Sequence, residues 1–286
     1  MQKRRKHSGL ILATVLGIVI PIAGTELFAT AALAQERAQQ ALTPLQVKIE
    51  EQKLRLNSAE VEDRREALIR LRSLHHPQAS RAALSALNDP SPIIRATAAA
   101  SVLSLPANES VSSLLPLLAD KEEFVRQQVA YALGHTRSSA AVTWLIERLA
   151  DKKDSVRGAA AVALGQIADA TAVTALAAVL NPQPGLTQSK KSKSKPEQNH
   201  FVLRAAAHSL GQIGSQAGLP ALILVLQDEK VEGDVRREAA SALGAIGDVS
   251  AIPALNSVLM ASDPYLSQAA HEALRKISRS QARRGV

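Results

Sequence analysis

The sequence has 286 residues, a formal net charge of +8 and 46% hydrophobic residues, so it can bury a core and is not a disordered chain. Aromatic residues make up only 2% whereas alanine occurs 51 times, which favours closely packed helices over the strands of a β-sandwich or barrel. The absence of cysteine excludes disulfide scaffolds, thiolate metal sites and a cysteine nucleophile.

The first 34 residues have the order of a secretory signal. Four basic residues at 3–6 precede an apolar run over 10–22, and Ala32-Leu33-Ala34 then places small residues two apart. The apolar run is short for a membrane span of about 20 residues, but the residues after it are apolar enough for an uncleaved membrane anchor. Because a basic flank stays in the cytoplasm, both readings place the remaining chain outside it, in the periplasm, envelope or thylakoid lumen.

The positive charge is concentrated in two segments. Beyond residue 34 the net charge is +5, from 30 Lys and Arg against 25 Asp and Glu. Residues 181–200 contribute +3 and residues 275–286 contribute +5, which leaves the rest of the chain at −3. We therefore do not expect a nucleic acid as a partner.

A period of 31 residues organises the chain after residue 60. One column of equivalent positions, usually apolar and followed by arginine, consists of Asp63, Ile94, Val125, Val156, Val202, Val235 and Leu266. A leucine column shares its intervals at Leu87, Leu118, Leu149, Leu180, Leu226 and Leu259, and a glycine column contains Gly134, Gly165, Gly211 and Gly244. Because independent columns have the same spacings, including the same longer intervals, they indicate a true internal repeat.

Each repeat predicts a helical hairpin. Residues 156–167 have apolar residues at helical spacing, Ala168-Asp169 is a break, and a second helix follows from about Ala172 to Leu180. At such breaks glycine can end a helix in the left-handed conformation, and Asp or Ser can cap the next start. Asp89, Asp120 and Asp151 precede first helices, and we predict that they cap them.

The stretch from Val235 to Asp248 reads VRREAASALGAIGD and resembles HEAT repeats of the short class shared with phycobilisome lyases. The resemblance covers residues 57–278, as six units and a terminal first helix. It implies an all-α fold, an α-solenoid of stacked helical hairpins whose binding surface is generally lined by second helices. A spacer or first capping helix over 35–56, with an amphipathic stretch from Leu45 to Leu56, would precede this domain, and a basic tail over 279–286 would follow it.

Arginine recurs beside the apolar column, at Arg64, Arg95, Arg126, Arg157 and Arg236. A functional basic ladder is one interpretation. We favour a structural role, in which each arginine pairs with the turn aspartate of a neighbouring repeat.

Two departures from the repeat are candidates for function. The proline-bounded insertion at 181–200 is either a solvated loop or an electrostatic arm for an acidic protein or an anionic membrane surface; its cations are Lys190, Lys191, Lys193 and Lys195. The other departure is aromatic, because Phe124, Tyr131 and Trp144 all belong to the third repeat. Trp144 stands where other repeats have alanine or serine, so it either fills a packing gap or anchors a partner, with Tyr131 as a second candidate.

No catalytic or metal-binding set is evident. His75-His76 has no third ligand at a suitable spacing, and the single His271-Glu272 pair argues against the di-iron chemistry of deoxyhypusine hydroxylase, an enzyme of this repeat class. We expect no catalytic residue, metal or cofactor. The leading hypothesis is an exported, non-catalytic scaffold that binds another protein; the alternatives are a bilin lyase or chromophore-handling relative and a membrane-anchored assembly factor.

Overall fold

The computed structural model describes residues 42–181 and 199–284. The chain divides at Val47 and Lys48 into two units, and residues 42–47 are the described part of the first. The predicted signal or anchor over residues 1–34 lies outside the described residues. Among the helices that are described, none has the length and apolarity needed to cross a membrane.

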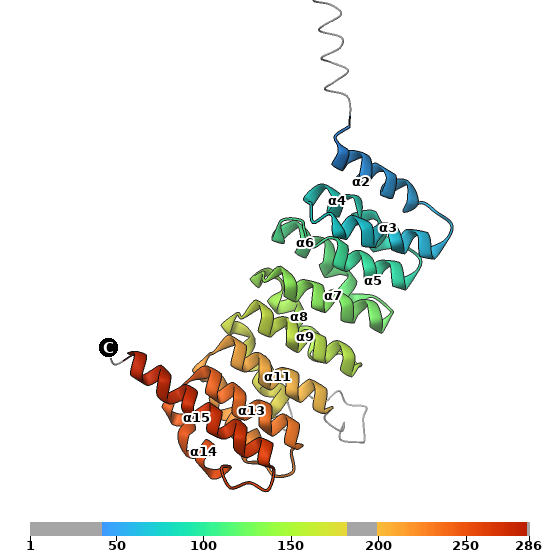
Figure 1. Ribbon diagram of the computed structural model, residues 1–286. Coiled ribbons are helices and arrows are strands. Elements are labelled where there is room, and N and C mark those ends of the chain that lie inside the picture. The colour runs from blue at the N-terminus through green and yellow to red at the C-terminus, as the bar shows by residue number, and fades with distance from the viewer. Residues whose placement is uncertain (1–41, 182–198, 285–286) are drawn as a thin grey trace, which may run out of the picture. The chain divides into compact units, whose positions relative to one another are not determined.

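The larger unit is an α-solenoid of helical hairpins, and its described residues contain no strand (Figure 1). The first helices of successive hairpins lie side by side: α3 (Val61–Ser73), α5 (Pro92–Ser101), α7 (Glu123–Thr136), α9 (Asp154–Ile167), α11 (His200–Ile213), α13 (Gly233–Ile246) and the terminal α15 (Pro264–Arg284). The fold class expected from the repeat is confirmed.

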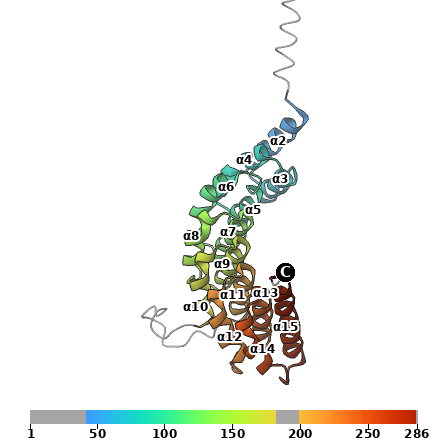
Figure 2. The same cartoon turned by 90° about the vertical axis from the view of Figure 1, so that its left-hand side faces the viewer.

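The second helices form another layer, which Figure 2 shows beside the first. They are α4 (Pro77–Ala82), α6 (Ala107–Leu114), α8 (Val142–Arg148), α10 (Val173–Leu180), α12 (Leu219–Gln227) and α14 (Ile252–Ser257). Short 3₁₀ segments extend this layer: η1 (Leu84–Asn88), η2 (Leu115–Ala119), η3 (Ser139–Ala141), η4 (Ala170–Ala172), η5 (Gln216–Gly218) and η6 (Val249–Ala251).

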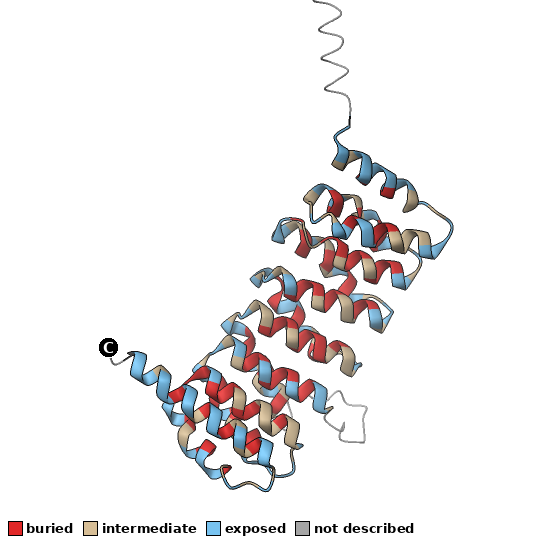
Figure 3. Cartoon of the chain, in the orientation of Figure 1, coloured by how far each residue is buried: buried red, intermediate tan, exposed pale blue. Residues whose placement is uncertain are grey.

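The core lies where the two layers and successive hairpins meet (Figure 3). Leucines at equivalent positions are fully buried on both layers: Leu133, Leu164, Leu210 and Leu243 on first helices, and Leu145, Leu176, Leu222 and Leu255 on second helices. A single hairpin exposes such a row, so stacking is what removes this apolar surface from water.

The glycine column lets consecutive first helices approach closely. A Cβ atom added to Gly244 would lie 2.6 Å from the Cα atom of Ala273 on α15, and one added to Gly211 would lie 2.9 Å from the Cα atom of Ala242 on α13. Both distances are below any normal carbon contact, so only glycine fits at these positions without moving the next helix.

First helices end as the sequence predicts, and not only at glycine. Gly214 and Gly247 have φ values of 71° and 73°, but Ala168 and Arg137 adopt the same left-handed conformation at 59° and 51°. After Ala168, Gly214 and Gly247 the next side chain caps a 3₁₀ segment; for example, Asp169 Oδ1 accepts the Thr171 N–H at 2.9 Å. Ser138, after Arg137, makes no such bond.

The predicted capping role of Asp89, Asp120 and Asp151 is wrong. Each carboxylate accepts the N–H of the residue two positions later, from Ser91, Glu122 and Lys153 respectively. Those residues are themselves the N-caps, and their side chains make no capping hydrogen bond. The aspartates therefore fix the turn before each helix, because they lie two residues before the N-cap and do not bond the free N–H groups of the first turn.

The 181–200 insertion does not separate the repeats on either side. The α11 helix begins at His200, inside the predicted loop, with Asn199 as its N-cap, and Asn199 Nδ2 donates to Asp154 Oδ2 on α9 at 2.7 Å. The Phe201 ring occupies the space that a side chain at Gly158 would need. These contacts hold α11 against α9.

The ends of the larger unit are helical. The amphipathic stretch predicted at Leu45–Leu56 forms α2 (Pro44–Arg55), and Arg55 forms ion pairs with Asp63 and Glu66 on α3. The predicted basic tail is not a separate segment, because α15 continues without a break to Arg284.

Candidate partner-binding surface

Three repeat arginines connect successive inter-repeat turns. Arg64, Arg95 and Arg126 each place Nε and Nη2 on the two carboxylate oxygens of the aspartate 25 residues later, at 2.7–3.1 Å. Their Nη1 atoms donate to backbone carbonyls of the preceding turn, at 2.8–3.2 Å. Four of the five N–H groups of each guanidinium are thus bonded within the fold, so these arginines do not form a basic ladder for a ligand.

The row of paired arginines stops at the insertion. Arg157 donates to the Asp151 carbonyl at 2.9 Å and pairs with Asp154 on its own helix, because the position 25 residues later is Pro182. Arg236 donates to the Leu226 carbonyl at 2.9 Å, and the equivalent later position is Ala261. Only the first three repeat arginines therefore form this bridge.

Electrostatics keep the buried pairs ionised. Burial by itself raises the pKa of Asp151, but hydrogen bonds from Arg126 and the Lys153 N–H, together with nearby positive charge, hold that pKa below its ordinary range. The pKa of Asp120 is lowered in the same way, by Arg95 and the Glu122 N–H. The hydrogen bond to Asp151 correspondingly raises the pKa of Arg126.

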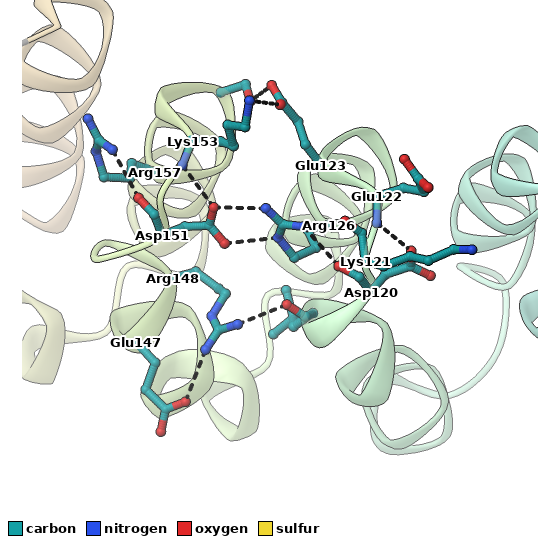
Figure 4. Close-up of polar contacts among 12 residues, drawn as sticks. Asp120, Lys121, Glu122, Glu123, Arg126, Glu147, Arg148, Asp151, Lys153 and Arg157 are labelled. Carbon is teal, nitrogen blue, oxygen red and sulfur yellow. Dashed lines mark hydrogen bonds and ion pairs between the residues drawn. The ribbon is translucent and has the colours of Figure 1, made fainter.

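An open polar pocket of about 440 Å³ lies beside this row, at the third repeat, between the turn at Asp120 and the turn at Asp151. Figure 4 shows Arg148 there, with Nη1 donating to the Leu118 carbonyl at 2.9 Å and Nη2 3.5 Å from Glu147. The Nε atom of Arg148 is buried and has no hydrogen-bond partner. The sequence analysis missed this residue, although the aligned repeats contained the signal: its column otherwise consists of Ala86, Leu117, Val179, Val225 and Val258.

The structure places the two aromatic candidates on different layers. Trp144 lies on α8, and 48% of its surface is exposed, whereas Tyr131 lies on α7 and is half-buried. The aligned positions on later second helices, Ala221 and Ala254, are buried. The indole therefore projects from a position that is buried in the last two repeats and half-buried at Ala82, Ser113 and Ala175.

The remaining candidates give no chemical site. Lys190, Lys191, Lys193 and Lys195 lie outside the described residues. Nδ1 of His76 accepts the Gln78 N–H at 3.2 Å and so caps α4. Within residues 42–181 and 199–284, no group of three or more His, Cys, Asp or Glu side chains is placed to hold a metal ion.

Exposed charges of the last repeats lie on first helices, as does Arg204 on α11, and in the turn after α12, at Asp228, Glu229 and Lys230. The Arg204–Asp234 ion pair (3.4 Å) and a hydrogen bond between His208 Nδ1 and Glu238 Oε1 (2.8 Å) link α11 to α13. A third pair, Arg237–Asp263 (3.3 Å), joins α13 to the residue before α15. The first-helix layer thus uses charged side chains to join repeats. Large apolar side chains are exposed on both layers, among them Ile69 and Phe124 on first helices and Trp144 and Leu224 on second helices.

Comparisons with known proteins agree with this architecture. A family model described as HEAT repeats matches residues 51–134, 111–189 and 196–275. A comparison with the curated proteins finds no match. Among solved structures, the chain is similar to YibA of E. coli, with 19% identity, a TM-score of 0.55, and coverage of 91% of this chain and 89% of that one.

Two further solved structures are also found. The complex of CpcE and CpcF of phycocyanin lyase from Nostoc sp. PCC7120 has 21% identity and a TM-score of 0.47, covering 84% of this chain and 95% of that one. Human deoxyhypusine hydroxylase has 18% identity and a TM-score of 0.36, covering 81% and 96%. These likenesses are too weak to transfer either activity. The three matched segments span most of the sequence, and the chain belongs to the HEAT repeat family.

Proposed function

We propose that this protein is an exported, non-catalytic HEAT-repeat scaffold that binds another protein through its second-helix layer. The observation that carries the proposal is Trp144, a large aromatic side chain that is 48% exposed in a column of small residues. Isolated exposed tryptophans commonly dominate protein interfaces because they bury a large area with few rotatable bonds.

Export is supported by the basic, apolar and small-residue order of residues 1–34. The membrane-anchored assembly factor differs only in keeping that segment. N-terminal sequencing of the native protein, after separation of cytoplasmic, membrane and exported fractions, tests both versions. A soluble species that starts near Gln35 supports export, an intact membrane species supports the anchor, and intact cytoplasmic protein contradicts both.

Replacement of Trp144 tests the binding surface. Truncation of an anchor of this kind costs about 2 kcal/mol, or roughly thirtyfold in affinity. We expect Trp144→Ala to reduce co-purification of partners from the native host by this factor, with unchanged helix content and melting temperature.

Phe124→Ala is the matched control, because Phe124 is 45% exposed in the same repeat but lies on a first helix. It should leave co-purification unchanged. A large fall in melting temperature in Trp144→Ala would show instead that the indole is part of the core.

A further inference from the structure

Arg148 places a charge at a position that the other repeats keep apolar. The aligned residues are Ala86, Leu117, Val179, Val225 and Val258. The Nε atom of Arg148 is buried, and it finds no acceptor in the part of the chain that the structure describes. A buried donor that is left unpaired costs stability. Folding alone therefore does not explain why an arginine stands here.

The guanidinium of Arg148 has no well-matched carboxylate within the fold. Nη1 donates to the Leu118 carbonyl at 2.9 Å, but the contact from Nη2 to the Glu147 carboxylate is 3.5 Å long (Figure 4). Hydrogen bonds between a guanidinium and a carboxylate are ordinarily about 2.7–2.9 Å long. Arg126, by comparison, holds both oxygens of Asp151 at 2.9 and 3.0 Å. Because 25% of the Arg148 side chain is exposed, an acceptor from outside can reach it.

Two lysines that also depart from the repeat line the same open pocket. Lys121 and Lys152 each stand three residues after the leucine column, in the turns that begin and end the third repeat. The other repeats have at this position Pro90, Gln183, Glu229 and Ser262. Both lysine side chains are exposed. Three cations that the repeat pattern does not require, including Arg148, therefore meet at one pocket.

The pocket has an excess of positive charge. Its lining contains four cationic and three anionic side chains. Two of the anionic ones, Asp120 and Asp151, are already held in arginine pairs, with Arg95 and Arg126 respectively. Glu147 is then the one lining carboxylate that opposes the three additional cations. Two positive charges are left unbalanced, which favours an acidic group and disfavours a cationic one.

We propose that this pocket binds an aspartate or glutamate side chain of the partner protein, with Arg148 holding the carboxylate and Lys121 and Lys152 attracting it. The proposal rests on the proposed function and specifies an acidic partner segment. The donors of an arginine form a fork that matches a carboxylate, and the flexible stems of lysines let their ammonium groups turn toward the charge. A nucleic acid fits less well, because the carboxylates of the pocket repel a dense row of phosphates.

Trp144 lies close to this pocket along the chain. It precedes Arg148 by four residues on α8, so the two positions are neighbours on one side of the helix. Both residues are departures from the repeat, and tryptophan and arginine are both enriched among the side chains that dominate binding energy. A partner segment with an apolar residue against the indole can therefore bring an acidic residue to Arg148.

A photo-crosslinking amino acid at residue 150 of the full chain, expressed in its native cells, tests the proposal. Ala150 is exposed and lines the pocket, whereas Ala245, the matched control position, is exposed on the first helix α13. Mass spectrometry identifies the crosslinked partner segments. We expect residue 150, and not residue 245, to crosslink to segments with Asp or Glu beside the crosslinked position. Crosslinks to segments without acidic residues, to nucleic acid or to lipid, or no crosslink at residue 150, would overturn the proposal.

A double-mutant cycle with the purified crosslinked partner gives the second measurement. Arg148→Leu, and replacement of the identified acidic residue by its amide, should each weaken binding at least tenfold, because either change breaks the charge pair. The double variant should bind no more weakly than either single variant. Arg275→Leu is the control, because it removes the same charge from an exposed position of α15, and it should leave the affinity unchanged.

Three results of the cycle would contradict the proposal. They are additive effects of the two substitutions, an unchanged affinity of Arg148→Leu, and equal losses in the two arginine variants. Melting temperatures at or above that of the wild type show that a loss of affinity in Arg148→Leu is not a loss of folding.

The outcomes also separate this proposal from the proposed function. If Trp144→Ala abolishes binding and Arg148→Leu leaves it unchanged, the scaffold proposal stands and the pocket is not part of its surface. If the cycle shows coupling at Arg148 while Trp144→Ala binds normally, the pocket is confirmed and Trp144 is not the anchor. If the wild type captures no protein in any arm, both proposals fail.

Discussion

Arg126 and Asp151 are 25 residues apart in sequence, yet their side chains form two parallel hydrogen bonds, with Nε–Oδ2 at 2.9 Å and Nη2–Oδ1 at 3.0 Å. Their side chains are 6% and 8% exposed. Nη1 of the same arginine donates to the carbonyl of Asp120 at 2.8 Å. One guanidinium therefore ties together the turns on either side of the third repeat.

Removal of one partner should destabilise the stack. Arg126→Met leaves the buried Asp151 carboxylate without its ion partner, and we expect a loss of roughly 2–4 kcal/mol in the free energy of unfolding, measured by urea denaturation. Arg81→Met is the control, because the Arg81–Glu109 pair is largely exposed, at 51% and 31%, and should matter much less. Equal losses in both variants would contradict the bridging role.

Acid should weaken the same turns. The folded pKa values of Asp120 and Asp151 lie below the unfolded value of about 3.9. Their contribution to stability is therefore complete above that value and is lost as the pH falls through the folded pKa values. We expect a constant melting temperature from neutral pH to about pH 5 and a steep fall below pH 4. The melting temperature of Asp151→Asn should be lower than that of the wild type at neutral pH and should fall less in acid. A melting-temperature curve parallel to that of the wild type would refute the assignment.

The left-handed helix ends offer a test with opposite signs. Ala168 has a positive φ, which is sterically unfavourable for a residue with a Cβ atom. Ala168→Gly should therefore stabilise the protein by about 1 kcal/mol. Gly214→Ala should destabilise it by a similar amount, because a Cβ there meets no atom within 4 Å and only the backbone conformation changes. Thermal denaturation of the two variants is sufficient, and shifts of the same sign would disprove the interpretation.

Arg148 should be dispensable for folding. Arg148→Leu removes the buried Nε that has no partner and restores the apolar residue of the aligned Leu117, so we expect the free energy of unfolding to rise by about 1 kcal/mol. Glu147→Gln is the control and should change little, since its contact with Arg148 is long and its side chain is 53% exposed. A clear loss in Arg148→Leu would mean that the hydrogen bond to the Leu118 carbonyl outweighs the unpaired Nε.

The fold could be predicted because its determinants repeat. Val125, Val156 and Val235 are each fully buried, as their shared column indicates, and each recurs with the same neighbours. A stack of repeats has only nearest-neighbour contacts, so periodicity in the sequence translates directly into packing. Long-range pairing, which is the hard part of most fold predictions, does not arise.

The surface was harder to predict. Residues such as Leu224 and Ala178 match the repeat pattern as well as buried ones do, and only the position of α12 and α10 in the stack shows that they face outward. The role of Asp151 was misjudged for a related reason. Its position before the helix suggested a cap, but its carboxylate binds the guanidinium of Arg126 in the preceding repeat and accepts the Lys153 N–H.

The contacts of Asn199 and Phe201 with α9 have an evolutionary consequence. They join the fourth and fifth repeats directly, so the fold does not depend on the length or composition of the connection between Leu180 and Asn199. That connection can gain, lose or exchange residues without altering the register of the stack. Recombination at this connection would leave the supporting architecture intact.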